Sequence, residues 1–324
     1  MKPLYITLII IAILAILITI YMIIMFDVFK KTIKKHKKND SSSLNDKLFT
    51  DLDKHRAFIQ TNSEIIKMIP FEKLYLQSKD NLKLCGYFYK GKNNTKKTII
   101  CVHGYCSSPY RGFSAIGQYY IKKGYNVLMT NNRAHEESEG NYIGFGVLDR
   151  YDIKQWIEYI NTIVPNTNIY LHGVSMGGGT VLMTSGLDLP DNVKGIIDDC
   201  GFTSPYEVFK RQIPTLLKLP PQPFLATLNL YTKLFAHYNL KESSVNALKK
   251  SKIPTIFIHG NNDIFVYPKM SQTNFDACNA PYKKIYFFEN TGHSDSYMND
   301  KAKFETAIED LFDYNDNLEI SKAK

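Results

Sequence analysis

Cysteine is scarce in this sequence, and its few cysteines show none of the spacings that build a covalent or metal framework. The five are scattered and odd in number, with no C-x-x-C pair: Cys85, Cys101, Cys106, Cys200 and Cys278. Several fall in predicted strands, which suits buried, reduced thiols better than a disulfide framework or a zinc site. The sequence also lacks a phosphate-binding glycine loop, ligand clusters and any internal repeat.

A second basic stripe is also missing, although the net charge is +9. The excess comes largely from six lysines between Lys30 and Lys38, and the remaining residues are close to balanced in charge. No nucleic-acid motif accompanies this stretch, so we expect no nucleic-acid partner. Hydrophobic residues make up 44% of the chain, which is ample for a sizeable core.

Charge is absent altogether from residues 4–26, the longest apolar run. As a helix rising about 1.5 Å per residue, this run would extend roughly 35 Å, enough to cross a membrane with modest tilt. The alternative is a cleaved signal peptide, but the run exceeds a typical apolar region of about 7–15 residues and no A-x-A-like site follows it. We therefore predict a single-pass anchor. A core helix fits less well, because the run has no polar face.

The charges around this run predict its orientation in the cell membrane. Only Lys2 and the amino terminus precede the run, whereas the six lysines follow it closely. The positive-inside rule therefore favours a cytoplasmic catalytic domain. Residues 27–71 are predicted to be a basic linker with an amphipathic helix over 44–68, which would pack on the domain or lie near the bilayer.

Short apolar runs alternate with helical patterns over residues 72–313. The predicted strands are 73–77, 82–89, 98–102, 125–130, 168–172, 193–198, 253–259 and 283–288. The predicted helices between them are 113–123, 148–163, 176–186 and 268–278. This alternation predicts an α/β fold with a mostly parallel, doubly wound sheet. Residues 314–324 are predicted to be a polar tail.

Residues 202–250 interrupt the alternation, because they are much longer than an ordinary crossover. They contain Pro214, Pro220, Pro221 and Pro223 and then an apolar helical stretch over 224–240. An insertion at this point is predicted to form a cap over the active site. The alternative is a structural excursion that only thickens the core.

The strand over 168–172 breaks into glycine around Ser175, as Gly173-Val-Ser-Met-Gly177. The G-x-S-x-G spacing is typical of a nucleophile elbow, in which small residues let the strand and the following helix approach closely. The serine hydroxyl then stands at a helix N-terminus, where backbone N–H groups favour negative charge. We predict that Ser175 is the nucleophile.

A serine nucleophile needs a base, and the base needs an orienting group. The strand over 253–259 opens into a polar turn with Asp263, and the strand over 283–288 is followed by Thr291-Gly-His293. We assign His293 as general base and then general acid, and Asp263 as the acid that orients it. The competing acids are Asp198 and Asp199. The remaining histidines weighed for the base are His135, the main rival, and His103, His172 and His259, which have the positions of structural residues.

The strand over 98–102 ends in His103-Gly-Tyr105, where the backbone turns and exposes an N–H. The N–H groups of Tyr105 and Met176 are predicted to form the oxyanion hole. These elements occur in the chain order of α/β-hydrolases, which is serine, acid and then histidine.

Residues 72–313 resemble an α/β-hydrolase of the serine aminopeptidase-like, BEM46-like group, which includes many single-pass membrane hydrolases. The motifs that carry the resemblance are Val102-His-Gly-Tyr-Cys-Ser-Ser108, His172-Gly-Val-Ser-Met-Gly-Gly178, Asp198-Asp-Cys-Gly-Phe-Thr-Ser204, Phe257-Ile-His-Gly-Asn-Asn-Asp263 and Thr291-Gly-His293. Relatives carry R-x-H-G-x-S-E-G, whereas Arg133-Ala-His-Glu-Glu-Ser-Glu-Gly140 has Glu136 in place of the glycine. This change adds a negative charge near the expected pocket mouth. The resemblance implies no metal and no organic cofactor.

The resemblance and the triad predict a membrane-anchored serine hydrolase that forms an acyl-Ser175 intermediate. The anchor and the apolar insertion favour a lipid-like or other apolar acyl substrate, joined by a carboxylic ester or thioester bond. The alternatives are a serine peptidase on the same fold and a catalytically inactive, membrane-anchored binding protein. The sequence makes no prediction of oligomeric state.

Overall fold

The protein was analysed as a computed structural model, which describes residues 2–35, 52–92 and 95–323. Its strands are β1 (Glu72–Gln77), β2 (Lys83–Tyr89), β3 (Lys97–Val102), β4 (Asn126–Thr130), β5 (Asn168–Val174), β6 (Val193–Asp199), β7 (Thr255–Gly260) and β8 (Lys283–Phe288). The helices outside the insertion are α1 (Lys2–Ile33), α3 (Leu52–Lys67), α4 (Pro109–Lys122), α5 (Asp149–Ile163), α6 (Met176–Thr184), α10 (Pro268–Ala277), α11 (Ser296–Asn299) and α12 (Lys301–Ala323).

The strands form one eight-stranded sheet in the order β1-β2-β4-β3-β5-β6-β7-β8. β1 pairs antiparallel with β2, and β2 pairs antiparallel with β4. Every other neighbouring pair is parallel. The predicted α/β fold with a mostly parallel sheet is therefore confirmed, and each predicted strand is present with small shifts at its ends.

Helices cover both faces of the sheet, because both faces of its central strands are apolar. One face packs against α3, α4 and α12, whose buried side chains include Ile66, Phe113 and Phe304. The other packs against α5 and α6, which bury Trp156 and Leu182. Strand β3 lies between β4 and β5, so the strand order changes direction there. Open α/β sheets form their ligand crevice at the carboxyl ends of the strands beside such a point.

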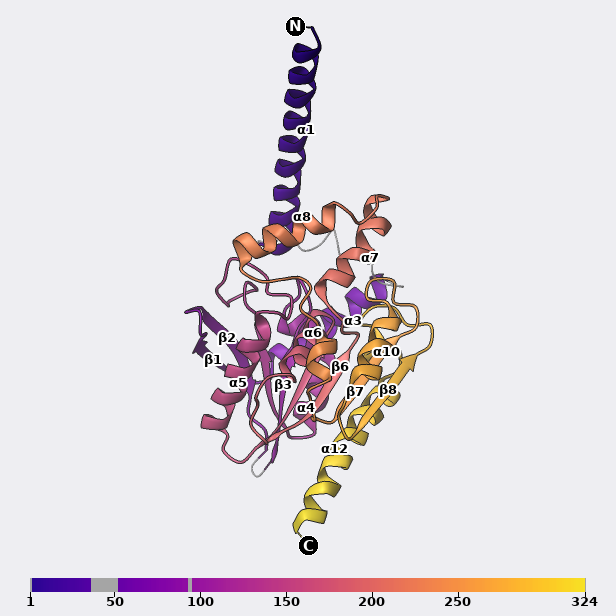
Figure 1. Cartoon of the computed structure of the whole chain (residues 1–324). Helices are drawn as coiled ribbons and strands as arrows, with labels where there is room; N and C mark the ends of the chain where they lie inside the picture. The colour runs from indigo at the N-terminus through magenta and orange to yellow at the C-terminus, as the bar shows by residue number, and fades with distance from the viewer. Residues whose placement is uncertain (1, 36–51, 93–94, 324) are drawn as a thin grey trace.

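The long helix α1 rises away from the domain, as Figure 1 shows. Side chains 4–20 are exposed, and the helix is long and apolar enough to span a membrane. Its foot, Tyr21–Ile33, packs on the domain instead, with Met25, Phe29 and Ile33 buried at intervals of four residues. Residues 27–33, predicted to be linker, therefore continue the helix. Of the predicted linker, residues 36–51 lie outside the described ranges, and α3 is the described part of the expected helix.

The insertion, residues 202–250, contains α7 (Pro205–Leu217), α8 (Phe224–Tyr231), the π-helical turn η1 (Thr232–Ala236) and α9 (Ser244–Leu248). Helix α8 crosses the foot of α1 (Figure 1). A third apolar cluster joins the foot of α1 and the insertion to the carboxyl edge of the sheet, where Met176 and Phe145 belong to it.

The structure describes residues 314–323 of the predicted polar tail and shows that they are helical. Residues 314–323 are the end of α12. Asn315 is buried, and Asp316 forms an ion pair with Lys97 at 2.7 Å. The helix continues there because its polar side chains find partners at the amino-terminal ends of β3 and β5, for instance Glu319 with Asn168.

Candidate active site

Ser175 lies between β5 and α6 in a strained backbone conformation, with φ 56° and ψ −114°. Gly173 and Gly177 explain why the turn can be so tight. A Cβ on Gly173 would overlap the carbonyl of Gly177, and a Cβ on Gly177 would overlap the carbonyl of Val102. The two glycines therefore allow α6 to begin directly against the ends of β5 and β3, and the side chain of Ser175 lines the crevice.

The structure brings together the three side chains predicted to be catalytic. The Ser175 hydroxyl lies 2.8 Å from His293 Nε2, and His293 Nδ1 donates to Asp263 Oδ2 at 2.6 Å. Because a carboxylate accepts the Nδ1 proton, Nε2 of the neutral ring is left as the acceptor for the serine hydroxyl. All three side chains are buried.

Asp263 is held as a carboxylate by its surroundings. Its Oδ1 accepts the backbone N–H groups of Phe265 and Val266 at 2.8 and 2.9 Å. His259 Nε2 lies 3.1 Å from Oδ2, and Ser271 fixes the other ring nitrogen at 2.6 Å. Burial opposes the charge of Asp263, but the charge of His293 and the hydrogen bond from His259 outweigh it, so the pKa of Asp263 is lowered. The sequence predicted only a structural role for His259, and in the structure its ring helps to position the carboxylate of Asp263.

The pKa of His293 is raised from its usual value. Burial alone would lower it, but the adjacent carboxylate of Asp263 dominates, with smaller contributions from Asp199 and Asp295. The imidazolium that forms during proton transfer is thereby stabilised.

The competing acids lie close by without taking the place of Asp263. Asp199 lines the same crevice, and burial raises its pKa to about 7. Its Oδ1 has no hydrogen-bond partner among the residues that the structure describes. Asp198 accepts the N–H of Gly201 at 3.0 Å and has a pKa raised well above its usual value by burial. Neither is hydrogen-bonded to His293 in the described part of the chain.

His135, the main rival for the base, has both ring nitrogens engaged by the backbone. Its Nε2 accepts the N–H of Cys106 at 3.2 Å, and its Nδ1 donates to the carbonyl of Arg133 at 2.9 Å. His103 is fixed in the same way by Gly104 and Asn132. These two rings stack edge to face and support the loop after β3, rather than facing Ser175.

This loop carries one of the two predicted oxyanion donors. Gly104 approaches the nucleophile so closely that a Cβ there would lie 3.3 Å from the Cβ of Ser175. The next residue, Tyr105, lines the crevice, and its hydroxyl donates to the carbonyl of Thr32 on α1 at 3.0 Å. Met176 is the first residue of α6, a position whose N–H has no acceptor within the helix. Their role as oxyanion donors stays a prediction.

The altered motif after β4 has a structural role. Arg133 is buried and pairs with Asp152 at 2.6 Å and Asp80 at 2.8 Å. Glu136 has φ 39°, a conformation that favours glycine, which explains why relatives carry glycine there. Its side chain is exposed and does not belong to the described lining of the crevice, and the expected charge near the pocket mouth stays a prediction.

The crevice around Ser175 encloses about 120 Å³. Helix α3 supplies an unexpected wall with His55, Phe58 and Ile59. His55 Nδ1 donates to Asp295 at 2.6 Å, which ties α3 to the loop that carries His293. None of the described lining residues comes from the insertion. The sequence signalled an amphipathic helix here but not the surface on which it packs.

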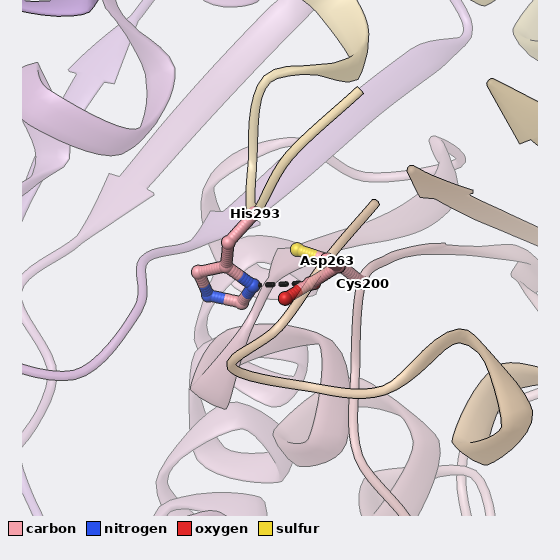
Figure 2. Close-up of side chains that lie close together, drawn as sticks. All are labelled: Cys200, Asp263 and His293. Atoms are coloured by element: carbon pink, nitrogen blue, oxygen red, sulfur yellow. Dashed lines mark hydrogen bonds and ion pairs between the residues drawn. The ribbon is translucent and has the colours of Figure 1, made fainter. Parts of the chain in front are cut away.

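Cys200 adds a third ligand type beside His293 and Asp263, and Figure 2 shows the three side chains together. Their ligand atoms lie within 4.8 Å of one another, a set that could contact a metal ion. However, Cys200 is buried, which raises the pKa of its thiol well above the usual value, and its Sγ lies 3.3 Å from the Ser294 hydroxyl. The two other groups already form the hydrogen bond to each other. The arrangement of His293 and Asp263 therefore fits a proton relay with Ser175 better than a metal site.

Comparisons with known proteins agree with this architecture. Residues 97–224 match the family model described as alpha/beta hydrolase fold. Protein YqkD of Bacillus subtilis is 25% identical over 241 residues, covering 72% of this chain and 78% of YqkD. Protein bem46 of Schizosaccharomyces pombe is 23% identical over 235 residues, covering 71% and 73%. The structure of the Pyrococcus furiosus esterase Pf2001 superposes with a TM-score of 0.63 at 20% identity, covering 76% of this chain and 91% of the esterase.

Proposed function

We propose that this chain, which has the α/β-hydrolase fold and is similar in sequence to bem46 and YqkD, is a membrane-anchored serine hydrolase. The proposed substrate is an apolar acyl group in a carboxylic ester or thioester. The observation that carries the proposal is the relay from Ser175 through His293 to Asp263, with 2.8 and 2.6 Å between the paired atoms.

In the proposed reaction, the Ser175 oxygen attacks the carbonyl carbon while His293 Nε2 takes the hydroxyl proton. The resulting oxyanion faces the N–H groups of Tyr105 and Met176, and Asp263 stabilises the imidazolium. Collapse breaks the bond to the leaving alcohol or thiol, which receives the proton from His293. Water then attacks the acyl-Ser175 with His293 as base again, which releases the carboxylic acid and restores the serine.

The lining of the crevice supports an apolar acyl group. Phe58, Ile59 and Ile116 line it with Phe265 and Met298. Apolar walls with few polar groups are typical of sites that bind hydrophobic ligands. The Pyrococcus furiosus protein Pf2001 is named an esterase, which agrees with ester chemistry on this fold. A peptidase remains the alternative reaction, and an inactive binding protein is disfavoured because the three side chains of the relay are present.

A chain-length series of p-nitrophenyl esters tests this proposal on the full chain in detergent micelles. We expect hydrolysis that is faster for medium or long acyl chains than for acetate, and its loss in Ser175→Ala. Thioester analogues of the same chain lengths distinguish the two bond types. Hydrolysis of acetate alone would contradict the apolar substrate, and unchanged hydrolysis by Ser175→Ala would contradict the mechanism.

We also propose that the catalytic domain lies on the cytoplasmic side, because lysines 30, 31, 34 and 35 follow the apolar run closely. A cysteine introduced at the exposed position of Lys252 tests this side. Slow labelling by an impermeant thiol reagent in intact cells, with fast labelling after lysis, is expected. Rapid labelling in intact cells would overturn the cytoplasmic orientation.

A further inference from the structure

The foot of α1 is both part of the apolar run and part of the folded domain. Residues 4–20, the side chains that stand clear of the domain, would cover only about 26 Å at about 1.5 Å per residue. The hydrocarbon core of a bilayer is about 30 Å thick. The clear part of α1 is therefore slightly too short to cross it alone, so the hydrocarbon must extend along the foot.

On one side of the foot of α1, the apolar side chains are exposed, as contact with the hydrocarbon requires. Ile23 is 65% exposed and Ile24 is 56% exposed, and the run stays free of charge until Asp27. The first exposed basic side chains, Lys30 and Lys31, come a turn later and pair with Asp27. Lysines commonly mark the depth of the lipid headgroups. The boundary of the hydrocarbon therefore falls between Ile24 and Lys30.

The other side of the same foot is packed against α8 and η1. The hydroxyls of Tyr21 and Thr227 are hydrogen-bonded at 2.8 Å, and the Tyr231 hydroxyl donates to the carbonyl of Met22 at 2.9 Å. The ring of Phe26 lies 5.2 Å from that of Phe235, centroid to centroid. Residues 21–26 lie at hydrocarbon depth, so α8 and η1, which touch them, lie at that depth too.

The outward face of α8 and η1 is apolar, which fits that position. Leu230 is 46% exposed, Leu234 is 57% exposed and Phe235 is 40% exposed. Leu230 and Leu234 are four residues apart, so they lie on one side of the continuous helix. Lys233 is exposed beside them, where its long side chain can reach the headgroups. The patch adjoins the proposed anchor at Phe235, whose ring lies beside the exposed ring of Phe26.

We propose that the foot of α1, α8 and η1 form one lipid-docking face that lies in the leaflet where α1 ends. The occupant is the acyl-chain region of the bilayer that α1 spans, so the inference rests on the proposed membrane anchoring. This face holds the domain at one depth, because α1 continues into it without a break. The carbonyl of Thr32 then accepts the hydroxyl of Tyr105, so the same helix that sets the depth also contacts the loop beside Ser175.

Tryptophan quenching in vesicles tests the proposal on the full chain. Single substitutions Leu230→Trp and Leu234→Trp are reconstituted into phosphatidylcholine vesicles that contain phospholipids brominated near the headgroup end or near the chain end. The native Trp156 is 1% exposed and provides a constant background. Ile320→Trp is the matched control, because Ile320 is 56% exposed on α12, at the opposite end of the molecule in Figure 1. Leu14→Trp reports on the anchor itself.

The proposal expects the shallow-brominated lipid to reduce the added fluorescence of Leu230→Trp and Leu234→Trp at least about twofold, with Ile320→Trp unchanged. Leu14→Trp should respond most to the deep-brominated lipid. If Leu14→Trp is quenched and both α8–η1 positions are not, the docking face is overturned and a protein partner, such as a second copy, covers it. If Leu14→Trp is not quenched, the anchor and the docking face fail together, whereas ester hydrolysis is judged separately.

Phe235→Trp guards against a variant that does not fold. It replaces one aromatic ring with another at a position that is 40% exposed. A near-UV circular dichroism spectrum and a melting temperature in micelles that match the wild type identify each correctly folded variant before reconstitution. If Phe235→Trp is folded and neither brominated lipid quenches its fluorescence, the result contradicts the docking face, as the same result for Leu230→Trp would.

Discussion

The relay of Ser175, His293 and Asp263 and the wall of α3, together with α1 that contacts the lining residue Tyr105, belong to the same crevice but are built in different ways. Each relay residue follows a strand within a few positions, and its side chain is hydrogen-bonded to another residue of the relay. The helices α1 and α3 are distant in sequence from the relay. Helix α1 contacts the crevice through the carbonyl of Thr32, which accepts the hydroxyl of Tyr105, and α3 contributes the side chain of Phe58. The relay can perform the bond-breaking chemistry, whereas the wall can only position the substrate and the loop around it. Variants of the two should therefore differ in size and in kind of effect.

The largest effect is expected for Asp263→Asn. The amide would donate to His293 Nδ1 and favour the wrong tautomer, which leaves no acceptor for the Ser175 proton. Loss of kcat by about 10⁴-fold is expected, as for other triads. The measurement is steady-state hydrolysis of a p-nitrophenyl ester. Asp276→Asn, on the exposed surface of α10, is the control and should be unchanged. An activity of Asp263→Asn within about tenfold of wild type would mean that another acid orients His293.

A smaller effect, confined to long acyl chains, is expected for Phe58→Ala. Removal of a partly buried ring from the crevice should cost about 1 kcal/mol of apolar contact, or about fivefold in KM. Hydrolysis of acetate should change little, because its acyl group does not extend to α3. Gln60→Ala, on the exposed side of the same helix, serves as control. Equal losses with acetate and long-chain esters would show that Phe58 supports the fold and not the acyl group.

Asp199→Asn should change the pH dependence and leave the plateau rate alone. The base must be neutral, so kcat/KM rises as pH passes upward through the raised pKa of His293. Asp199 contributes to that rise in pKa, after the larger effect of Asp263. Near and above its own pKa of about 7, where Asp199 is ionised, removal of its charge lowers the pKa of His293, so the acidic limb moves to lower pH and the rate in that range increases a few-fold. A pH-stat profile of kcat/KM measures this; a limb that moves to higher pH, or a lost plateau, would contradict it.

The smallest effect is expected for Tyr105→Phe, which removes the hydrogen bond to Thr32 but keeps the backbone N–H. Loss of one hydrogen bond at a partly buried site costs about 0.5 kcal/mol, at the low end of the usual range, so kcat should fall about twofold. Tyr21→Phe is the matched control, since it removes a hydroxyl that joins α1 to Thr227 away from the crevice. If the two variants have equal activity, the contact between α1 and the oxyanion loop does not act on catalysis.

The difference between relay and wall also explains what could be predicted from the sequence. The turn around Ser175 has to contain Gly173 and Gly177 for steric reasons, so its geometry is determined locally. His293 and Asp263 follow strands whose apolar pattern is equally local, which is why the fold and the positions of these residues could be predicted. Their meeting follows from the parallel order of β5, β7 and β8.

The wall carries no such local signature. The apolar sequence of α1 predicts that lipid or protein covers this helix. The sequence does not predict which side of the helix contacts lipid and which side contacts the domain. Helix α3 has an amphipathic pattern that fits many surfaces. The residues at the end of α12 are polar, so the sequence predicted a tail there. Their partners lie at the amino-terminal ends of strands in the sheet, for example Lys97 for Asp316. These contacts depend on long-range packing, which no short stretch of sequence determines.

The central claim, that Ser175 is the nucleophile, is tested most directly by mapping the adduct of a fluorophosphonate probe on the full chain. Intact mass and peptide mapping of the wild type should show one adduct, on Ser175. Ser175→Ala should remain unlabelled, whereas Ser107→Ala, which alters another serine of the same crevice, should be labelled as the wild type is. Equal labelling of Ser175→Ala and wild type would contradict the account.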